Sequence, residues 1–133
     1  MVYTAAMAEK RAALDHVAVG VSDLARSRAF YEPALAALGL DRVHASDSGE
    51  QVLFGDGDAW VFVISTAYRV GAPVHVAFGA ESIEQVQAFH AAGLAAGGTD
   101  HGAPGPRPQY SERYYGAFVL DPDGHNVEAV TRI

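Results

Sequence analysis

Apolar and polar positions along this chain form short strand-like runs that are separated by two longer segments of helical spacing. The first run, from Leu14 to Val21, alternates valines on one face with His16 and two small residues on the other face. Such alternation is typical of a strand that buries one of its faces. A helix is then predicted from Leu24 toward Leu38, because aromatic and aliphatic residues recur at intervals of three and four. Pro33 removes a backbone donor inside this segment and should kink or interrupt the helix.

Three short strands are predicted after this helix, and the pattern then begins again. The three strands are expected at Leu40 to Ala45, Glu50 to Phe54 and Ala59 to Ser65, with polar turns between them. A second opening strand, from Val74 to Gly79, is followed by a second helix, from Ser82 to Ala96. The order of elements in the first half therefore starts again in the second half.

The last third of the chain combines a proline-rich segment with a hairpin. The segment from His101 to Ser111 contains three prolines, so it cannot form a central strand, and we interpret it as a long loop. Two further strands, Tyr115 to Leu120 and Asn126 to Arg132, flank the turn from Asp121 to Gly124. Proline at the second position and glycine at the fourth position of this turn are typical of a type I turn.

An internal repeat relates the two halves at an offset of 59 residues. From His16 to Leu40, 10 of 25 positions are identical to the positions 59 residues later. The repeat aligns His16 with His75, so each half presents one histidine at the start of its opening strand. We therefore predict an α+β fold of two tandem β-α-β-β-β modules, which form a curled mixed sheet around a cavity.

One domain is expected for a chain of 133 residues. We assign residues 1–13 to a flexible lead-in and residues 14–133 to a single domain, with module one at 14–67 and module two at 74–133. Each half is small for an independent core, so the halves should share a core or pair with a second chain. The symmetry of the halves favours a two-fold homodimer.

The charge and composition exclude several classes of partner. Nine Lys and Arg residues against 16 Asp and Glu residues give a net charge of −7, which gives no support for a nucleic-acid or anionic-membrane partner. The chain has no cysteine, so disulfides and thiolate metal sites are excluded. No apolar run approaches the roughly 18 residues of a membrane span, and the start of the chain lacks a signal-peptide core. We therefore expect a cytoplasmic protein that acts on a small molecule.

Three side chains are candidates for a metal site. Glu128 stands in a strand otherwise built for burial, where a lone carboxylate is costly unless it is paired or metal-bound. His16 and His75 have small same-face neighbours that leave room around each imidazole for an ion. Two histidines and one carboxylate form a candidate facial triad, which leaves open positions on a divalent metal. In the alternative, each histidine is a hydrogen-bonded core residue, and Glu128 faces solvent on an edge strand.

Other residues are candidates for contacts with a substrate. Tyr114 and Tyr115 lead into a strand that should lie beside Glu128, so one of them can act as an acid, a base or an oxyanion donor. For at least one of the two, packing in the core is the alternative. Arg107, Gln109 and Arg113 lie in the proline-rich loop and can bind an anionic group of a substrate, or can be exposed without a role.

The remaining candidates are a loop histidine and two aromatic residues. His101 lies in the proline-rich loop and can reach the mouth of a pocket. Trp60 and Phe62 are expected to line the cavity or the core rather than to contact a cofactor. The other histidines are interpreted as structural or surface residues: His44, His90 and His125.

These motifs resemble the vicinal oxygen chelate superfamily, which includes glyoxalase I, bleomycin- and fosfomycin-resistance proteins, extradiol dioxygenases and methylmalonyl-CoA epimerase. The resemblance covers residues 14–131 and rests on the His-Val-Ala start of each half, on Phe30-Tyr31, and on the stretch from Phe118 to Glu128. Its most specific part is the Asp-Pro-Asp-Gly turn that leads into a strand with a glutamate. The segment from Pro104 to Val119 is similar to an uncharacterised glyoxalase-like subgroup.

The resemblance implies paired β-α-β-β-β modules, a dimer in many members, and one divalent metal ion (Fe, Mn, Ni, Zn or Co) at the centre of the cavity. By position, His16, His75 and Glu128 match the ligands on the first, fifth and eighth strands. The fourth ligand of the glyoxalase I pattern is missing from the strand that contains Trp60 to Ile64. This departure counts against glyoxalase I activity. Three ligands fit the dioxygenase pattern better, although the chain is shorter than two-domain extradiol enzymes.

Two functions follow from these expectations. The first is a metal-dependent lyase, isomerase or ring-cleaving dioxygenase, in which the ion chelates vicinal oxygens of a small substrate. The second is a metal-free drug- or metabolite-binding protein of the bleomycin-resistance type. The acidic net charge suits a cationic ligand of such a protein. The three intact candidate ligands argue against sequestration, because sequestration requires no metal ligands.

Overall fold

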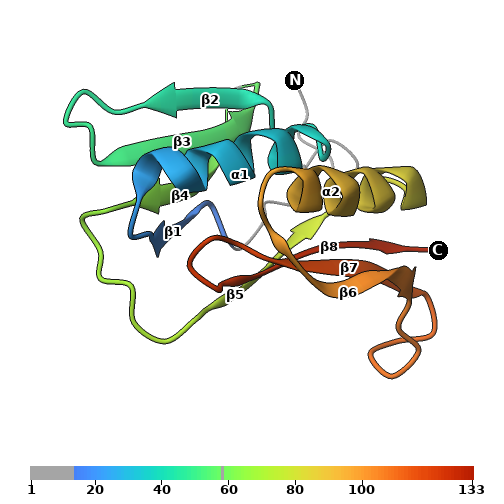
Figure 1. The fold of residues 1–133 in the computed structure, drawn as a ribbon. Helices are drawn as coiled ribbons and strands as arrows, with labels where there is room; N and C mark the ends of the chain where they lie inside the picture. Colours follow the sequence, from blue (N-terminus) through green and yellow to red (C-terminus); the bar gives the residue numbers. More distant parts are fainter. Residues whose placement is uncertain (1–13, 58) are drawn as a thin grey trace, which may run out of the picture.

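The computed structural model describes residues 14–57 and 59–133, and the predicted lead-in at 1–13 lies outside these residues. The chain forms two successive modules (Figure 1). Module one contains β1 (Val17–Gly20), α1 (Leu24–Ala36), β2 (Arg42–Ala45), β3 (Gln51–Asp56) and β4 (Ala59–Ser65). Module two contains β5 (His75–Gly79), α2 (Ile83–Ala95), β6 (Thr99–Pro106), β7 (Tyr114–Leu120) and β8 (Asn126–Arg132). The predicted α+β fold of two β-α-β-β-β modules is confirmed.

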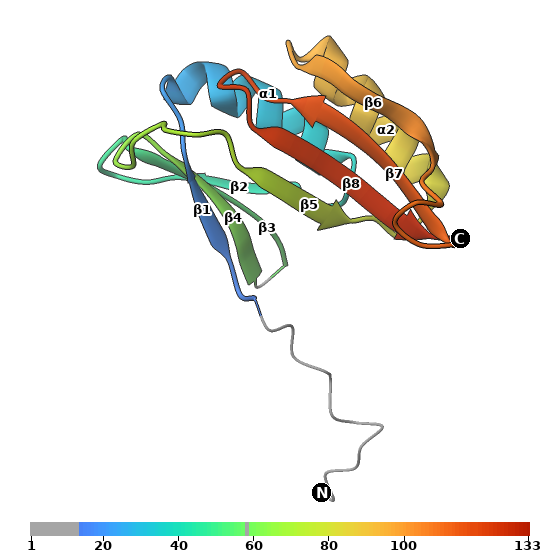
Figure 2. The same cartoon turned by 90° about the horizontal axis from the view of Figure 1, so that it is seen from below.

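Each module builds one mixed sheet of four strands. The strand orders are β1-β4-β3-β2 and β5-β8-β7-β6, so the opening strand of each module lies at an edge. The opening strand pairs in parallel with the last strand of its module, and the other pairs are antiparallel. The two sheets are separate and do not close into a barrel. Helices α1 and α2 pack against each other and leave the opposite face of each sheet open (Figure 2).

One hydrophobic core runs through both modules between the helices and the sheets. Tyr31 of α1 packs on Phe62 of β4 with ring centroids 5.0 Å apart. Phe62 in turn meets Phe78 of β5 edge-on, at 5.2 Å and 81°. Each buried aromatic side chain of this kind contributes about 1.5–3 kcal/mol to stability. The two halves therefore share a core, as their small size requires.

Helix α1 begins after Asp23, whose side chain accepts a hydrogen bond from the Arg26 backbone N–H at 3.1 Å. The helix runs through Pro33, so the expected interruption does not occur. Pro33 removes only one backbone bond, to the carbonyl of Ala29. The buried residues on either side of it, including Leu35, outweigh that loss through packing. Among the described residues, no helix is long and apolar enough to cross a membrane.

Strand β6 corrects the interpretation of 101–111 as one long loop. Residues Thr99–Pro106 form a strand that pairs with β7. Because β6 is the outer strand of its sheet, Pro104 and Pro106 lie where a missing N–H is tolerated. The register with β7 shifts on both sides of Gly102, which accommodates the irregular sequence. Proline content excluded a central strand but did not exclude an edge strand.

The turn from Asp121 to Gly124 joins β7 to β8 and also contacts module one. The Gly124 N–H donates to the Asp121 carbonyl at 3.0 Å, and Gly124 has φ +88°. The Asp121 carboxylate accepts a hydrogen bond from the Tyr31 hydroxyl at 2.5 Å. The Asp123 carboxylate accepts one from the Ser22 backbone N–H at 3.1 Å. The turn therefore attaches the last two strands to the start and middle of α1.

His125 completes this connection between the modules. Its side chain is buried, and Nδ1 accepts a hydrogen bond from the Val74 backbone N–H at 3.1 Å. Because Nδ1 is an acceptor, Nε2 carries the ring proton and donates to the Gly20 carbonyl at 2.9 Å. The expected structural role of His125 is thus confirmed. The end of β1 and the start of β5 are held side by side.

Candidate metal centre

The open face of the second sheet carries a cavity of about 470 Å³. Its lining comes from β5, β7, β8 and the turn after β6: His75, Tyr110, Tyr114, Phe118, Asn126 and Glu128. Alternation along each strand sends these side chains away from the helices, while their sequence neighbours enter the core. Three of the predicted residues of module two, His75, Tyr114 and Glu128, therefore meet on one face.

His75 and Glu128 are in direct contact in this cavity. His75 Nε2 lies 3.0 Å from Glu128 Oε1. The Glu128 side chain is 2% exposed and that of His75 is 50% exposed, so the carboxylate is buried and the imidazole lies at the opening. A buried carboxylate is costly unless it meets donors or a cation. Glu128 therefore has in His75 the partner that a buried carboxylate requires.

The hydrogen bond of His75 Nδ1 determines which kind of partner Nε2 needs at its contact with Glu128. His75 Nδ1 lies 3.0 Å from the backbone carbonyl of Asn126, which can only accept, so Nδ1 carries a proton. In neutral imidazole, Nε2 is then an unprotonated acceptor that faces the carboxylate oxygen. Two acceptors at 3.0 Å need a proton or a cation between them. A backbone carbonyl behind the histidine is one of the usual outer partners of a metal-ligating imidazole.

Tyr114 holds the other oxygen of Glu128. Its hydroxyl donates a short hydrogen bond to Glu128 Oε2. Gly116 makes room for this contact, because a Cβ there would lie 3.1 Å from Oε2 and 3.2 Å from Tyr114 Cε1. Burial, followed by the hydrogen bond to Glu128 and its charge, raises the pKa of Tyr114 to about 12. Tyr114 is therefore a protonated donor at neutral pH.

His16 lies apart from this pair, just before β1, with its side chain 58% exposed. Its Nδ1 is 2.8 Å from Asp15 Oδ1. The Gly20 end of β1 adjoins the start of β5, where His75 lies. His16 is at the other end of β1, four residues and therefore about 13 Å away from Gly20. His16 instead shares a cavity of about 500 Å³ with Gly79, at the far end of β5.

Only two of the three candidate ligands therefore meet within one chain. Over residues 14–57 and 59–133, no group of three His, Cys, Asp or Glu side chains is arranged to hold a metal ion. The face of the first sheet that carries His16 is also open. It has its own cavity of about 550 Å³. His16 thus lies on the open face of one sheet, and the His75–Glu128 pair lies on the open face of the other.

The other predicted residues divide between these faces and the core. Trp60 lines the cavity of the first sheet together with His16, and the Arg42 guanidinium stacks on the indole at 3.8 Å. Phe62 is fully buried in the core. Tyr115 is also a core residue, on the helix side of the second sheet. Of the two neighbouring tyrosines, the one in the cavity is therefore Tyr114.

The candidates from the proline-rich segment do not all line one cavity. His101 and Arg107 line a smaller cavity of about 210 Å³ on the second sheet. This cavity shares Tyr110, Phe118 and Asn126 with the larger one. Gln109 is exposed in the turn that follows β6.

Phe118 and Asn126 are site residues that the sequence argument did not select. Their positions follow from the register of the last hairpin, in which Leu120 pairs with Asn126 and Phe118 pairs with Glu128. The sequence contained this signal, because a type I turn followed by glycine typically closes a hairpin with a three-residue loop, which places Asp121 opposite His125. Asn126 Oδ1 is buried and has no hydrogen-bond partner among the described residues.

The sequence and the fold just described match a known group of proteins. The sequence profile of the Glyoxalase/Bleomycin resistance protein/Dioxygenase superfamily matches residues 13–129. The chain therefore belongs to this superfamily. A glyoxalase/bleomycin resistance protein from Albidiferax ferrireducens T118 is 35% identical over 91% of this chain and 100% of its own, with a TM-score of 0.80.

Two more distant structures share the fold. Lactoylglutathione lyase from Agrobacterium tumefaciens is 21% identical over 90% of this chain and 93% of its own, with a TM-score of 0.65. A glyoxalase/bleomycin resistance protein/dioxygenase family enzyme from Burkholderia phytofirmans PsJN is 18% identical over 92% and 100%, with a TM-score of 0.66. Among curated proteins, none matches the chain significantly.

Proposed function

We propose that this protein is a metal-dependent enzyme in which one divalent ion chelates two neighbouring oxygens of a small substrate. The reaction belongs to the lyase and isomerase class or to ring-cleaving dioxygenation. The observation that supports this is the contact of His75 Nε2 with Glu128 Oε1 at 3.0 Å. One imidazole nitrogen and one carboxylate oxygen suit Fe, Mn, Ni, Zn or Co.

The residues around this pair fit a metal ion. The Asn126 carbonyl orients the imidazole, and the Tyr114 hydroxyl orients the carboxylate, so each ligand has an outer partner. When bound, the ion would polarise substrate oxygens and stabilise negative charge that develops on them. Phe118 supplies an apolar wall beside the pair, and the protonated Tyr114 keeps its single O–H directed at Glu128.

We further propose that His16 of a second copy of the chain completes the ligand set. Each protomer presents one half-site on each open sheet face, and the repeat makes the two faces equivalent. In such a dimer, the first sheet of one protomer faces the second sheet of its partner. Each His75–Glu128 pair then lies beside the His16 imidazole of the other protomer. Large apolar residues are exposed near these openings, including Leu14 at 73% and Tyr110 at 60%, and a dimer would cover them.

A second candidate function is metal-free binding of a drug or metabolite. It is favoured by the separation of His16 from the other two candidate ligands within one chain. On this reading the open cavities hold a ligand by shape and by hydrogen bonds, and the contact of His75 with Glu128 is an ordinary ion pair of protonated histidine.

Metal content distinguishes the two functions. Metal-free protein is reconstituted with each candidate ion, and metal is measured by mass spectrometry and titration calorimetry. The enzyme hypothesis predicts about one ion per chain, lost in His75→Ala and in Glu128→Gln and retained in the control His44→Ala. A wild type that takes up no ion, yet binds small ligands equally well after His75→Ala, would support the binding protein instead. Iron(II) retained under anaerobic purification favours oxygen chemistry, and nickel, zinc, manganese or cobalt favours proton transfer.

A further inference from the structure

We propose that the substrate is an organic anion whose carboxylate binds Arg107, at the opposite end of a groove from the His75–Glu128 pair. This inference rests on the proposed function and adds the substrate class to it. The groove is formed by the two cavities on the open face of the second sheet, which share Tyr110, Phe118 and Asn126. We call it the second-sheet groove.

The order of strands across the sheet sets the length of this groove. His75 lies on β5, Glu128 on β8 and Phe118 on β7, and Arg107 follows β6. The Phe118 ring is stacked 6.1 Å from the His75 ring, and it lies 5.4 Å from the Arg107 Cζ atom. An aromatic floor therefore separates the ligand pair from the guanidinium. Two strand spacings place Glu128 and the β6 edge about 10 Å apart, which suits a small aromatic or planar acid.

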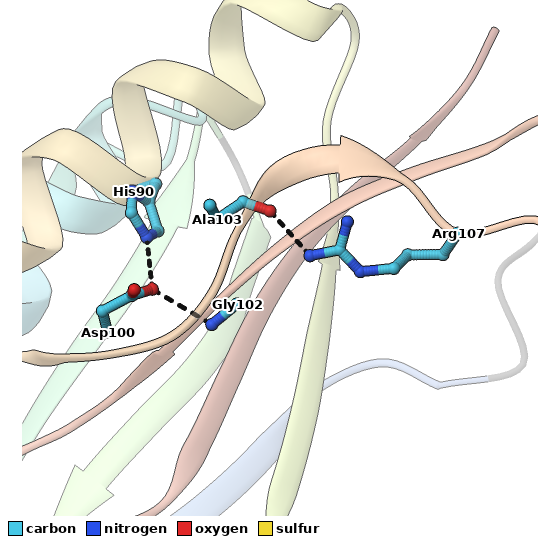
Figure 3. Close-up of polar contacts among 5 residues, drawn as sticks. All are labelled: His90, Asp100, Gly102, Ala103 and Arg107. Carbon is cyan, nitrogen blue, oxygen red and sulfur yellow. Dashed lines mark hydrogen bonds and ion pairs between the residues drawn. The ribbon is translucent and has the colours of Figure 1, made fainter.

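Arg107 is fixed in place by the backbone of β6. Its guanidinium turns back along the strand, and Nη2 donates to the Ala103 carbonyl at 2.6 Å (Figure 3). Nη1 donates to the carbonyls of Gly105 and Pro106 at 3.0 and 3.3 Å. A Cβ at Gly102 or Gly105 would lie 3.2 Å from a guanidinium nitrogen, so two glycines leave the space that the group occupies. A side chain held in this way loses little entropy when it binds a ligand.

This arrangement leaves Arg107 able to bind an anion. The three contacts to carbonyls use three of the five guanidinium N–H groups. None of the ion pairs among residues 14–57 and 59–133 involves Arg107, so its charge is not neutralised by a described carboxylate. Guanidinium groups bind carboxylates through charge-assisted hydrogen bonds, which are about twice as strong as neutral ones.

A contact from α2 holds the irregular part of β6 beneath the guanidinium. His90 Nε2 lies 2.9 Å from Asp100 Oδ1, and the same oxygen accepts a hydrogen bond from the Gly102 N–H at 3.1 Å (Figure 3). These contacts fix the shift of register around Gly102. His101, which lines the groove beside Arg107, is fixed with it and provides a second nitrogen donor for an anion.

Two ligands that differ only in a carboxylate test the proposal. Catechol and 3,4-dihydroxybenzoate present the same pair of neighbouring oxygens, and their affinities for the zinc-loaded protein are measured by calorimetry. We expect the carboxylate to improve binding by about 10-fold or more in the wild type. In Arg107→Gln this ratio should fall to near one while the affinity for catechol is unchanged. Arg107→Lys should keep part of the ratio, because it keeps the charge.

The controls separate a binding role from a purely structural one. Arg113→Gln removes another arginine of the same segment, whose Nε donates to the Ile133 carbonyl, and should leave the ratio unchanged. An unchanged ratio in Arg107→Gln would overturn the proposal. So would an equal loss of affinity for both ligands, because this would show that Arg107 only braces β6.

The same question can be asked without a metal. Benzoate and benzyl alcohol are compared on the metal-free protein and on its Arg107→Gln variant. If the chain binds no ion but prefers benzoate through Arg107, the proposed function fails and the anion site stands. If the chain binds metal normally but Arg107→Gln has no effect with either pair of ligands, the anion site fails alone.

Discussion

The hydroxyl of Tyr31 donates a hydrogen bond to the Asp121 carboxylate at 2.5 Å and links the first helix to the turn before the last strand. Both residues are buried, and the other Asp121 oxygen accepts the backbone N–H groups of Asp123 and His125. Burial, together with the charge of Asp121, raises the pKa of Tyr31 well above its usual value, so the phenol stays a donor. The turn thus acts at the junction of the modules, away from the candidate ligands.

Removing this donor should destabilise the protein. Tyr31→Phe keeps the ring in the core but leaves a buried carboxylate oxygen without its partner, so we expect a loss of roughly 1–3 kcal/mol in the free energy of unfolding. Urea unfolding measures the loss. Tyr115→Phe is the matched control, because that hydroxyl has only a long contact of 3.4 Å, and it should cost about 0.5 kcal/mol or less. Equal costs for the two variants would contradict a special role of the Tyr31–Asp121 bond.

Mixing two defective variants tests whether two protomers share one metal site. His16→Ala and Glu128→Gln should each lose the complete site when purified alone. If each site takes His16 from one protomer and Glu128 from the other, unfolding and refolding an equal mixture makes half of the dimers mixed, each with one intact site. About one quarter of the wild-type activity or complete metal sites should then return. No recovery from a mixture that forms dimers would show that the ligands come from a single chain.

Tyr114 should tune the affinity for metal through Glu128. Tyr114→Phe removes the hydroxyl that orients the carboxylate, and the loss of such an outer partner typically weakens metal binding by about 10-fold or more. Calorimetric titration with zinc gives the dissociation constant. Tyr110→Phe provides the control, since that exposed ring packs edge-on against Tyr114 at 5.2 Å without contact to the carboxylate. An affinity unchanged in Tyr114→Phe would mean that Glu128 is oriented by the sheet alone.

The contact between His90 and Asp100 should give a pH-dependent contribution to stability. The hydrogen bond from His90, followed by that from the Gly102 N–H, lowers the pKa of Asp100. A carboxyl whose pKa is lower in the folded state contributes its full stabilisation above its unfolded pKa, about 3.9, and loses it as the pH falls through the folded value.

The stability difference between the wild type and Asp100→Asn should therefore be constant above about pH 5 and shrink below pH 4. Urea unfolding across this range measures it. Asp47→Asn, at an exposed turn position, should show no such trend. A difference that stays constant to pH 2 would refute the assignment to Asp100 ionisation.

Most of the fold could be predicted because it is encoded locally. The signals for the opening strands, the helices and the turn before β8 each involve residues that are neighbours in the chain. The internal repeat then predicted the same order of elements in the second module. The prediction failed at β6 for a physical reason. Pro104 and Pro106 exclude a strand only where both edges must pair, and whether a strand is at an edge is decided by the rest of the sheet.

The sequence by itself determined the two modules and the chemical types of the candidate ligands, because side-chain periodicity fixes which residues share a face. Only the tertiary structure decided which candidates meet. His75 meets Glu128 because β5 and β8 are neighbours in one sheet. His16 lies elsewhere because the packing of α1 on α2 and the Tyr31–Asp121 bond set how the two sheets are placed. That placement depends on contacts between residues far apart in the chain, which no local pattern records.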